Sequence, residues 1–395
     1  MRAVTWQGRR DVRVEQVPDP MLQGAGEIIV QVTTTGLCGS DLHLYEVLGP
    51  FMTPGDILGH ETMGVVVEKS PDVANVELGD RVVVPFQIAC GHCFMCERGL
   101  QTQCEVTQVR EQGMGAALFG YSRLYGSVPG GQAEYLRVPH ADYGPITVSG
   151  DLPDERYVYL SDVMPTAWQA VRYAEVGADQ TLAIVGLGPI GDMAARLAAH
   201  EGIRVIGFDR VPERLARLRD RGIEVADIDR VDPVEVVRAA TGGRGADGVI
   251  DAVGMEAHGS TIAETAQKLV GRLPGPVARA AMTRVSVDRM GALDLALSLV
   301  RRGGTVSLSG VYAGTMDPIS LQSMFDRQLS VRMGQANVRR WVDDLRPLAE
   351  DSSDPLGLAS FATHHLDLAQ APHAYDIFQR KAEGAVKVLF HPFGQ

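Results

Sequence analysis

Four of the five cysteines of this chain lie in one short segment, which restricts the local fold more strongly than any other feature. The segment reads Cys90-Gly-His-Cys93-Phe-Met-Cys96, and Cys104 follows after seven residues. This spacing predicts one loop that wraps around a tetrahedral zinc ion. Four sulfur ligands leave no position for water or substrate, so the predicted site is structural rather than catalytic. Disulfides are the alternative, but bridges across such short gaps are strained.

Length and charge limit the classes of protein to which the chain can belong. Its 395 residues are more than a single hydrophobic core usually contains, so two domains are expected. The formal net charge of −12 repels a phosphate backbone and argues against nucleic-acid binding. The N-terminus lacks the apolar core of a signal peptide, and no apolar run is long enough to span a bilayer. We therefore expect a cytoplasmic protein without a membrane partner, in a compartment that keeps cysteines reduced.

Hydrophobic periodicity separates a strand-rich part of the chain from an alternating part. Short β-branched runs broken by Gly, Pro and Asp, from residue 27 to about 138, predict an irregular β-rich domain. After Pro165 strands and helices alternate, which is typical of a doubly wound parallel sheet. The predicted strands are 181–185, 204–208, 248–251, 305–309 and 329–333, and the predicted helices are 167–175, 192–201 and 212–221.

The C-terminal part returns to a mixed pattern and is predicted to rejoin the first domain. It contains a short segment at 361–365, a predicted helix at 371–381 and a predicted strand at 386–390. The predicted domains are 1–155 with 337–395, including the cysteine lobe at 89–105, and 156–336. Residues 256–288 form a longer segment than the usual connection between two parallel strands, and they are predicted to be an insertion.

A glycine-rich turn follows the strand predicted at 181–185. Gly186, Gly188 and Gly191 open the next helix, so the backbone can approach a pyrophosphate and the helix N-terminus faces it. Asp209 closes the following strand about 20 residues later, where an acid binds the ribose hydroxyls and repels a 2′-phosphate. The turn therefore predicts NAD as cofactor; a glycine-rich turn without a ligand is the less favoured interpretation.

Arg210 bears on the choice between NAD and its phosphorylated form. It either pairs with a phosphate or lies over the adenine, and the second interpretation is favoured. The predicted cofactor-binding residues are Gly186, Gly188, Pro189, Ile190, Gly191, Asp209, Arg210, Arg214, Val253 and Val311.

The remaining cysteine lies near two other groups that can bind metal. Cys38 belongs to Gly-Leu-Cys-Gly-Ser-Asp-Leu-His, and His60 and Glu61 belong to Gly-His-Glu-Thr-Met-Gly downstream. A catalytic zinc needs three protein ligands and one open position, where it lowers the pKa of an alcohol or water. Cys38 and His60 supply two of these ligands.

These motifs, with the cysteine lobe and the nucleotide fold, resemble the zinc-dependent medium-chain alcohol dehydrogenase family over essentially the whole chain. The resemblance implies an α/β protein with a GroES-like β-rich catalytic domain and a Rossmann coenzyme domain. In that family the third zinc ligand stands just before the coenzyme domain, and Asp162 occupies the position usually held by cysteine. Without the resemblance, Asp162 would be interpreted as a helix cap.

Asp162 narrows the resemblance to the branch similar to glutathione-independent formaldehyde dehydrogenase. That branch has a Cys-His-Asp ligand set, the sequence Gly-Gly-Gln-Ala-Glu-Tyr found here at 130–135, and an extra segment that would correspond to 256–288. The resemblance places this segment against the adenine end of the cofactor, which implies slow release of NAD.

The resemblance also assigns roles to individual residues. Cys38, His60 and Asp162 would bind the catalytic zinc, and Glu61 would visit the metal during ligand exchange. Cys90, Cys93, Cys96 and Cys104 would bind the structural zinc.

A proton pathway follows from the same resemblance. Ser40 would take the proton of the alcohol and pass it through the cofactor ribose to His43 near solvent. Thr166 would lie against the nicotinamide. A surface histidine is the alternative interpretation of His43, and His92 in the cysteine lobe is expected to be solvated.

The implied function is oxidation of an alcohol or a hydrated aldehyde such as formaldehyde by a zinc- and NAD-dependent oxidoreductase. The alternatives are a dehydrogenase of a larger primary alcohol or polyol, and a non-catalytic zinc-binding protein on the same scaffold. The acidic charge and the cysteine spacing disfavour a nucleic-acid-binding zinc ribbon. The expected ligands are two zinc ions, NAD and a small-molecule substrate, and a dimer or tetramer is expected.

Overall fold

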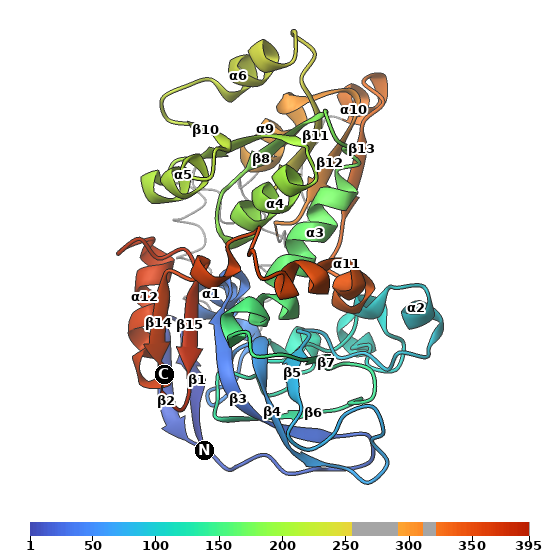
Figure 1. Cartoon of the computed structure of the whole chain (residues 1–395), viewed down its shortest axis with the longest axis vertical. Helices are drawn as coiled ribbons and strands as arrows, with labels where there is room; N and C mark the ends of the chain where they lie inside the picture. Colours follow the sequence, from blue (N-terminus) through green and yellow to red (C-terminus); the bar gives the residue numbers. More distant parts are fainter. Residues whose placement is uncertain (255–290, 311–320, 395) are drawn as a thin grey trace. The chain divides into compact units, whose positions relative to one another are not determined.

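The computed structural model describes residues 1–254, 291–310 and 321–394 of the chain, which form two compact units. The first unit comprises Met1–Pro165 and Ala336–Gln395, and the second comprises Thr166–Gln335 (Figure 1). Residues 156–165 thus belong to the first unit, whereas the sequence placed them in the second. The reason is local packing, because Arg156 donates hydrogen bonds to the carbonyls of Ala349, at 2.8 Å, and Asp351, at 2.6 Å. The insertion predicted at 256–288 lies outside the described residues.

The first unit is built on a seven-stranded sheet with the order β14-β15-β3-β4-β5-β7, to which β6 adds by pairing with β3. Only β14 and β15 run parallel, and the other neighbouring strands are antiparallel. The strands are β3 (Ile28–Leu37), β4 (Glu61–Lys69), β5 (Arg81–Val84), β6 (Tyr135–Val138), β7 (Ile146–Val148), β14 (His364–Asp367) and β15 (Val388–His391). A separate antiparallel pair contains β1 (Arg2–Gly8) and β2 (Asp11–Gln16). This part of the chain is strand-rich and irregular, as predicted.

Short helices connect these strands. The α-helices are α1 (Gly39–Glu46), α2 (Phe94–Glu97), α11 (Val338–Glu350) and α12 (Ala371–Arg380), and α3 (Val163–Tyr173) continues into the second unit. The 3-10 helices are η1 (Gly49–Phe51), η2 (Gln101–Gln103), η3 (Arg110–Gln112), η4 (Arg123–Tyr125), η5 (Asp154–Arg156), η6 (Val158–Ser161), η8 (Leu358–Ser360) and η9 (Leu368–Gln370). Helix α12 buries apolar residues at helical spacing, and it confirms the helix predicted at 371–381.

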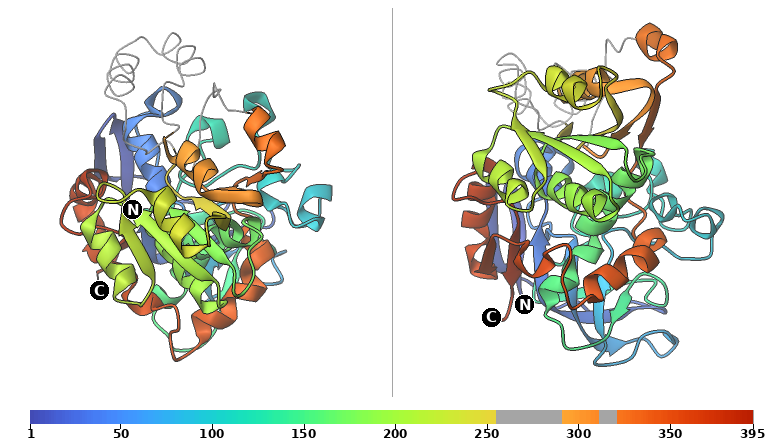
Figure 2. Two further views of the ribbon diagram at one scale, coloured as in Figure 1. Left: turned by 90° about the horizontal axis from the view of Figure 1, so that it is seen from above. Right: turned by 45° about the horizontal axis from the view of Figure 1, so that its top comes forward.

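The second unit contains a parallel sheet with helices packed against it (Figure 2). The sheet has six strands in the order β10-β9-β8-β11-β12-β13. Its strands are β8 (Thr181–Val185), β9 (Arg204–Asp209), β10 (Glu224–Asp227), β11 (Ala246–Asp251), β12 (Val300–Leu308) and β13 (Ser330–Met333). The helices are α4 (Pro189–His200), α5 (Pro212–Arg219), α6 (Pro233–Ala240), α9 (Gly291–Leu299) and α10 (Leu321–Asp326). The strand order reverses between β8 and β11, which is the switch point at which dinucleotides bind in this topology. The predicted doubly wound sheet is confirmed.

Several element boundaries differ from the prediction by a few residues, and two of these differences have a clear physical reason. Helix α4 begins at Pro189 rather than residue 192, because Gly188 is its N-cap and proline suits the first helical position. Strand β12 begins earlier than predicted, at Val300, because it pairs with Ala246 of β11 before a β-bulge. No helix within the described ranges is long and apolar enough to cross a membrane.

Candidate active site

Strand pairing in the first unit brings the predicted zinc ligands together. Cys38 follows the last residue of β3, and His60 precedes the first residue of β4. The two strands are antiparallel, with Gly36 opposite Glu61, so the end of one lies beside the start of the other. Asp162 follows η6. The Phe86 amide, in the loop after β5, donates a hydrogen bond to the Ser161 carbonyl of η6 at 3.2 Å and so joins the two segments.

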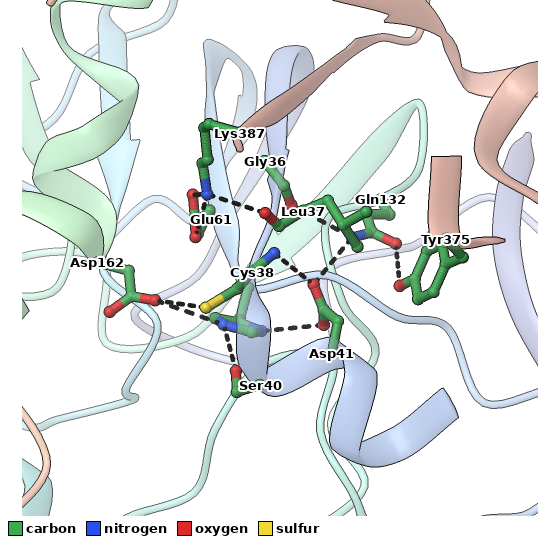
Figure 3. A network of polar contacts seen from close by, with 11 residues as sticks. Gly36, Leu37, Cys38, Ser40, Asp41, Glu61, Gln132, Asp162, Tyr375 and Lys387 are labelled. Atoms are coloured by element: carbon green, nitrogen blue, oxygen red, sulfur yellow. Dashed lines mark hydrogen bonds and ion pairs between the residues drawn. The ribbon is translucent and has the colours of Figure 1, made fainter. Parts of the chain in front are cut away.

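The potential metal ligands converge in a buried position (Figure 3). Single ligand atoms of Cys38, His60, Glu61 and Asp162 all lie within 4.8 Å of one another. The Asp162 carboxylate is 3.3 Å from the Cys38 sulfur and 3.6 Å from His60 Nε2. Ligands at zinc distances of about 2.0–2.3 Å are separated by about 3.3–3.7 Å in a tetrahedron, so these spacings fit a zinc ion.

The electrostatics of the side chains alone also favour a bound cation. Burial, reinforced by Asp162, raises the pKa of the Cys38 thiol to about 12. Burial by itself would lower the pKa of His60, but Asp41 and Asp162 raise it well above its usual value. Burial thus disfavours the anionic form of Cys38, and the carboxylates beside His60 favour positive charge at this position. A divalent cation would supply that positive charge and displace the protons from its ligands.

Asp41 orients the imidazole and was not predicted to have a role. Its carboxylate lies 3.4 Å from His60 Nδ1 and accepts a hydrogen bond from the Cys38 amide at 3.0 Å. A metal-binding histidine commonly contacts a carboxylate through its other ring nitrogen, which directs the first nitrogen to the metal. The signal in the sequence was the position of Asp41 in Cys-Gly-Ser-Asp, where it is also residue N3 of the capping box of α1.

A further layer of hydrogen bonds supports Asp41. Gln132 donates to the Asp41 carboxylate at 3.3 Å and to the Gly36 carbonyl at 3.2 Å. The Tyr375 hydroxyl, from α12, donates to the Gln132 side-chain carbonyl at 2.8 Å. This chain of contacts links the C-terminal part of the unit to His60, and the sequence offered no signal for it.

Glu61 forms a fully buried ion pair with Lys387, which the sequence analysis also missed. The ammonium group contacts both carboxylate oxygens and donates to the Leu37 carbonyl at 3.0 Å. Burial raises the pKa of Glu61, and Lys387 opposes that shift. A single lysine between the valines at 386 and 388 was the available signal, because an unpaired charge is rarely buried.

The predicted relay residues lie in different environments. The Ser40 hydroxyl is 3.1 Å from His60 Nε2, next to the potential ligands. His43 was expected near solvent, and this expectation is wrong, because the residue is only 7% exposed. It lies in α1, whose adjacent residues Leu42 and Leu44 are also buried. Thr166 lies in α3, where the second unit begins.

The four lobe cysteines form the second cluster. All are free thiols, and their sulfur atoms lie within 4.8 Å of one another, with Cys93 and Cys104 3.9 Å apart. A tetrahedron of thiolates at about 2.3 Å from zinc has edges of about 3.8 Å, so the cluster fits the ion. The alternative of disulfides is not observed. His92 is exposed, as expected, and its Nδ1 lies 3.0 Å from the Cys90 carbonyl.

Hydrogen bonds from backbone amides favour the thiolate form of two cysteines in this lobe. Although burial opposes the change, the amides of Cys96 and Glu105 lower the pKa of Cys93 to about 6. Backbone and side-chain donors at Thr107 similarly lower the pKa of Cys104, against the effect of burial. Thiolates are the form that binds zinc.

The glycine-rich turn after β8 has the close contacts that dinucleotide binding requires. Gly186 has φ +87°, a conformation that favours glycine. A Cβ atom on Gly191 would lie 1.9 Å from the Gly186 carbonyl oxygen, and one on Gly186 would meet Val253 at 2.4 Å. Gly188 caps α4, and Pro189 and Ile190 form its first residues. Val311 lies outside the described residues.

Asp209 holds the turn from the end of β9. One carboxylate oxygen accepts a hydrogen bond from the Leu187 amide at 2.7 Å, and the other accepts from the Arg210 amide at 2.7 Å. Arg214 lies 3.6 Å from this carboxylate. The Arg210 side chain points elsewhere and lies 3.7 Å from Asp229. The Asp209 carboxylate is therefore buried beside the glycine-rich turn, and Arg214 partly balances its charge.

Comparisons with known proteins agree with this architecture. Residues 24–148 match the alcohol dehydrogenase GroES-like domain, and residues 189–273 match the zinc-binding dehydrogenase domain. The zinc-type alcohol dehydrogenase-like protein AdhB of Bacillus subtilis (strain 168) is 37% identical and covers 99% of this chain and 100% of its own length. Formaldehyde dismutase of Pseudomonas putida is 32% identical and covers 100% of this chain and 98% of its own length.

A solved structure extends this agreement to three dimensions. The alcohol dehydrogenase TADH from Thermus sp. ATN1 superposes with a TM-score of 0.80 at 33% identity, over 99% of each chain. The first unit is thus GroES-like and the second is a Rossmann domain. Fold, donor set and whole-length relatives together establish that the chain is a dehydrogenase of the zinc-dependent medium-chain alcohol dehydrogenase family.

Proposed function

We propose that this dehydrogenase oxidises a small primary alcohol or hydrated aldehyde, with formaldehyde as the leading substrate and NAD as hydride acceptor. The observation that carries the proposal is the convergence of the Cys38 sulfur, His60 Nε2 and the Asp162 carboxylate. Similarity to formaldehyde dismutase over the whole chain supports the choice of substrate.

The three proposed ligands suit alcohol oxidation because of their combined charge. The Cys38 thiolate and the Asp162 carboxylate balance the two positive charges of zinc, and His60 adds none in its neutral form. When bound, zinc supplies the Lewis acidity that lowers the pKa of the substrate hydroxyl. Asp41 holds the His60 ring in place, and Lys387 keeps the nearby Glu61 carboxylate compensated.

Ser40 is the proposed first proton acceptor. Its hydroxyl lies within hydrogen-bond distance of His60, at the edge of the ligand set, and can bind the substrate hydroxyl there. His43 follows in the same helix as the proposed next site. Since His43 is buried, the proton needs a further carrier to reach solvent.

NAD is proposed over NADP because of Asp209. Its buried carboxylate stands at the end of β9, where it would repel a 2′-phosphate. Arg210 lies by the exposed Asp229 instead of balancing this charge. A kcat/KM that is at least as high with NADP as with NAD would reject this assignment.

We also propose a cytoplasmic homo-oligomer with two zinc ions per chain, the second in the cysteine lobe. The assembly proposal rests on β13, an edge strand whose four residues are all exposed, and on the neighbouring α10. Phe325 and Leu321 of α10 are 88% and 72% exposed. Unpaired strand edges and apolar patches of this kind mark association surfaces.

Proton NMR of the purified protein with NAD and formaldehyde tests the activity. Formate and methanol are counted with and without a zinc chelator, for the wild type, Asp162→Asn and the control Asp376→Asn, whose half-exposed side chain pairs with Arg380. Formate that disappears with the chelator and falls strongly only in Asp162→Asn is expected. No formate from zinc-loaded wild-type protein would reject formaldehyde, and a panel of larger primary alcohols and polyols would then identify the alternative substrate class.

A further inference from the structure

Another group of potential metal ligands lies in the first unit and is made of different residues from both zinc sites. Glu155, His365 and His391 each offer one ligand atom, and the three atoms lie within 4.8 Å of one another. We call these residues the Glu155 cluster. None of them belongs to the cysteine lobe or to the Cys38 site.

Strand register brings the two histidines together. In the parallel pair β14 and β15, His365 is opposite Leu389. Residues two positions apart on a strand share a face, so His391 is the diagonal neighbour of His365 on that face. Glu155 comes from η5 and reaches both rings. Three segments that are distant in the sequence therefore contribute one ligand each.

The distances among the ligand atoms fit a transition-metal ion. His365 Nδ1 and His391 Nε2 are 3.2 Å apart, and Glu155 Oε1 lies 3.7 Å from the first and 3.9 Å from the second. One point in the plane of these atoms is about 2.1 Å from all three, and zinc binds imidazole nitrogen and carboxylate oxygen at about 2.0–2.2 Å. No rearrangement of the backbone is needed to reach those distances.

The surroundings of His391 select the ring nitrogen that faces the cluster. Thr34 Oγ1 donates a hydrogen bond to Asp154 at 3.2 Å and lies 3.5 Å from His391 Nδ1. With its proton directed to Asp154, the hydroxyl can accept from Nδ1–H. In that tautomer the lone pair of His391 is on Nε2, the atom nearest His365. An outer hydrogen bond of this kind is the usual support for a metal-binding histidine.

We propose that the Glu155 cluster is a third zinc site, with two imidazole ligands, one carboxylate and an open position for water. The side chains of Glu155 and His365 are 22% and 29% exposed, so an ion and a water molecule can enter from solvent. The ion would tie the C-terminal pair β14 and β15 to η5. In the chain, η5 is followed by η6 and Asp162. The ion would therefore hold the segment that carries Asp162 in place, without contacting the Cys38 site.

Zinc counting with a matched pair of histidine variants tests the site. His365→Ala removes a ligand, whereas His364→Ala removes the neighbouring ring of β14, which contacts Thr363 instead. Full-length proteins are equilibrated in buffers of fixed micromolar free zinc and analysed by elemental analysis and thermal unfolding. Wild type and His364→Ala are expected to hold one more zinc ion per chain than His365→Ala, with a zinc-dependent rise in Tm that His365→Ala lacks.

Glu155→Gln provides a second, independent readout, because it keeps the size of the side chain and removes the anionic ligand. The apparent affinity for the additional zinc ion is expected to fall by about tenfold or more. Equal zinc content in wild type, His365→Ala and Glu155→Gln would overturn the proposal. All variants keep the five cysteines, His60 and Asp162, so this result does not depend on dehydrogenase activity.

Discussion

At the scale of single residues, the position of His60 depends on a carboxylate behind it. Asp41 faces His60 Nδ1 and also holds the Cys38 amide, so one side chain positions two proposed ligands. Gln132 and Tyr375 hold that carboxylate in turn. The positions of the proposed ligands therefore depend on residues that are not themselves proposed to bind the metal.

Asp41→Asn tests this positioning role. The substitution keeps the size of the side chain and weakens the contact with His60, so zinc affinity and kcat/KM are expected to fall by about 10–100-fold. Steady-state kinetics and zinc affinity measure the effect, with Asp376→Asn as the control at a half-exposed carboxylate. A fall in kcat/KM with unchanged zinc affinity would contradict a role through His60.

Lys387→Met tests the buried ion pair. Removal of one partner leaves the Glu61 carboxylate uncompensated in the core, and the free energy of unfolding is expected to fall by about 3–5 kcal/mol. Urea unfolding monitored by circular dichroism measures this change. The double variant Lys387→Met/Glu61→Gln removes both charges and should recover most of the loss. A single variant as stable as wild type would show that the pair contributes little.

At the scale of elements, the two units use different devices to place functional groups. In the first unit the ends of β3 and β4 present Cys38 and His60, because antiparallel pairing sets those ends side by side. In the second unit the turn between β8 and α4 presents backbone amides, and its close contacts leave no room for side chains. A strand pair thus positions side chains, and a glycine turn positions the backbone.

Gly191→Ala tests the turn. Its new Cβ atom would lie 1.9 Å from the Gly186 carbonyl oxygen, so the backbone must move away from the conformation that faces the pyrophosphate. We expect the Kd for NADH to rise by at least about tenfold, since a shift of one ångström at such a site costs more than 1 kcal/mol. Fluorescence titration measures the Kd. Gly291→Ala, where a Cβ atom meets nothing within 4 Å, should bind like wild type.

At the scale of the whole molecule, the chain leaves the first unit at Pro165 and returns at Ala336. The returning part supplies Lys387 and Tyr375 to the site, and β14 and β15 to the sheet. The second unit ends in the exposed edge strand β13, with apolar side chains on α10 beside it. The candidate active site and the proposed association surface thus both depend on how segments distant in the sequence come together.

Phe325→Glu tests the association surface. A charge on this apolar patch should oppose burial against a second chain, so the proposed oligomer is expected to dissociate toward monomers. Light scattering after size-exclusion chromatography measures the mass. Leu78→Glu changes a comparably exposed apolar residue of the first unit and should leave the mass unchanged. A Phe325→Glu protein with the same mass as wild type would place the interface elsewhere.

Local spacing was sufficient for much of the fold and for the identity of the proposed ligands. The cysteine lobe, the glycine turn and the alternation of strands and helices each depend on residues close in the sequence, and each appears in the structure. The pairing of Cys38 with His60 followed from two short motifs and a resemblance. These features are set by short-range geometry, which a sequence displays directly.

Only the tertiary structure decided which groups support that site. Lys387 and Glu61 are separated by 326 positions, and Tyr375 and Gln132 by 243, so no local pattern could pair them. The burial of His43 and the meeting of Glu155, His365 and His391 also depend on how distant segments pack. Burial and charge compensation are properties of the folded core, and they arise only when those segments come together.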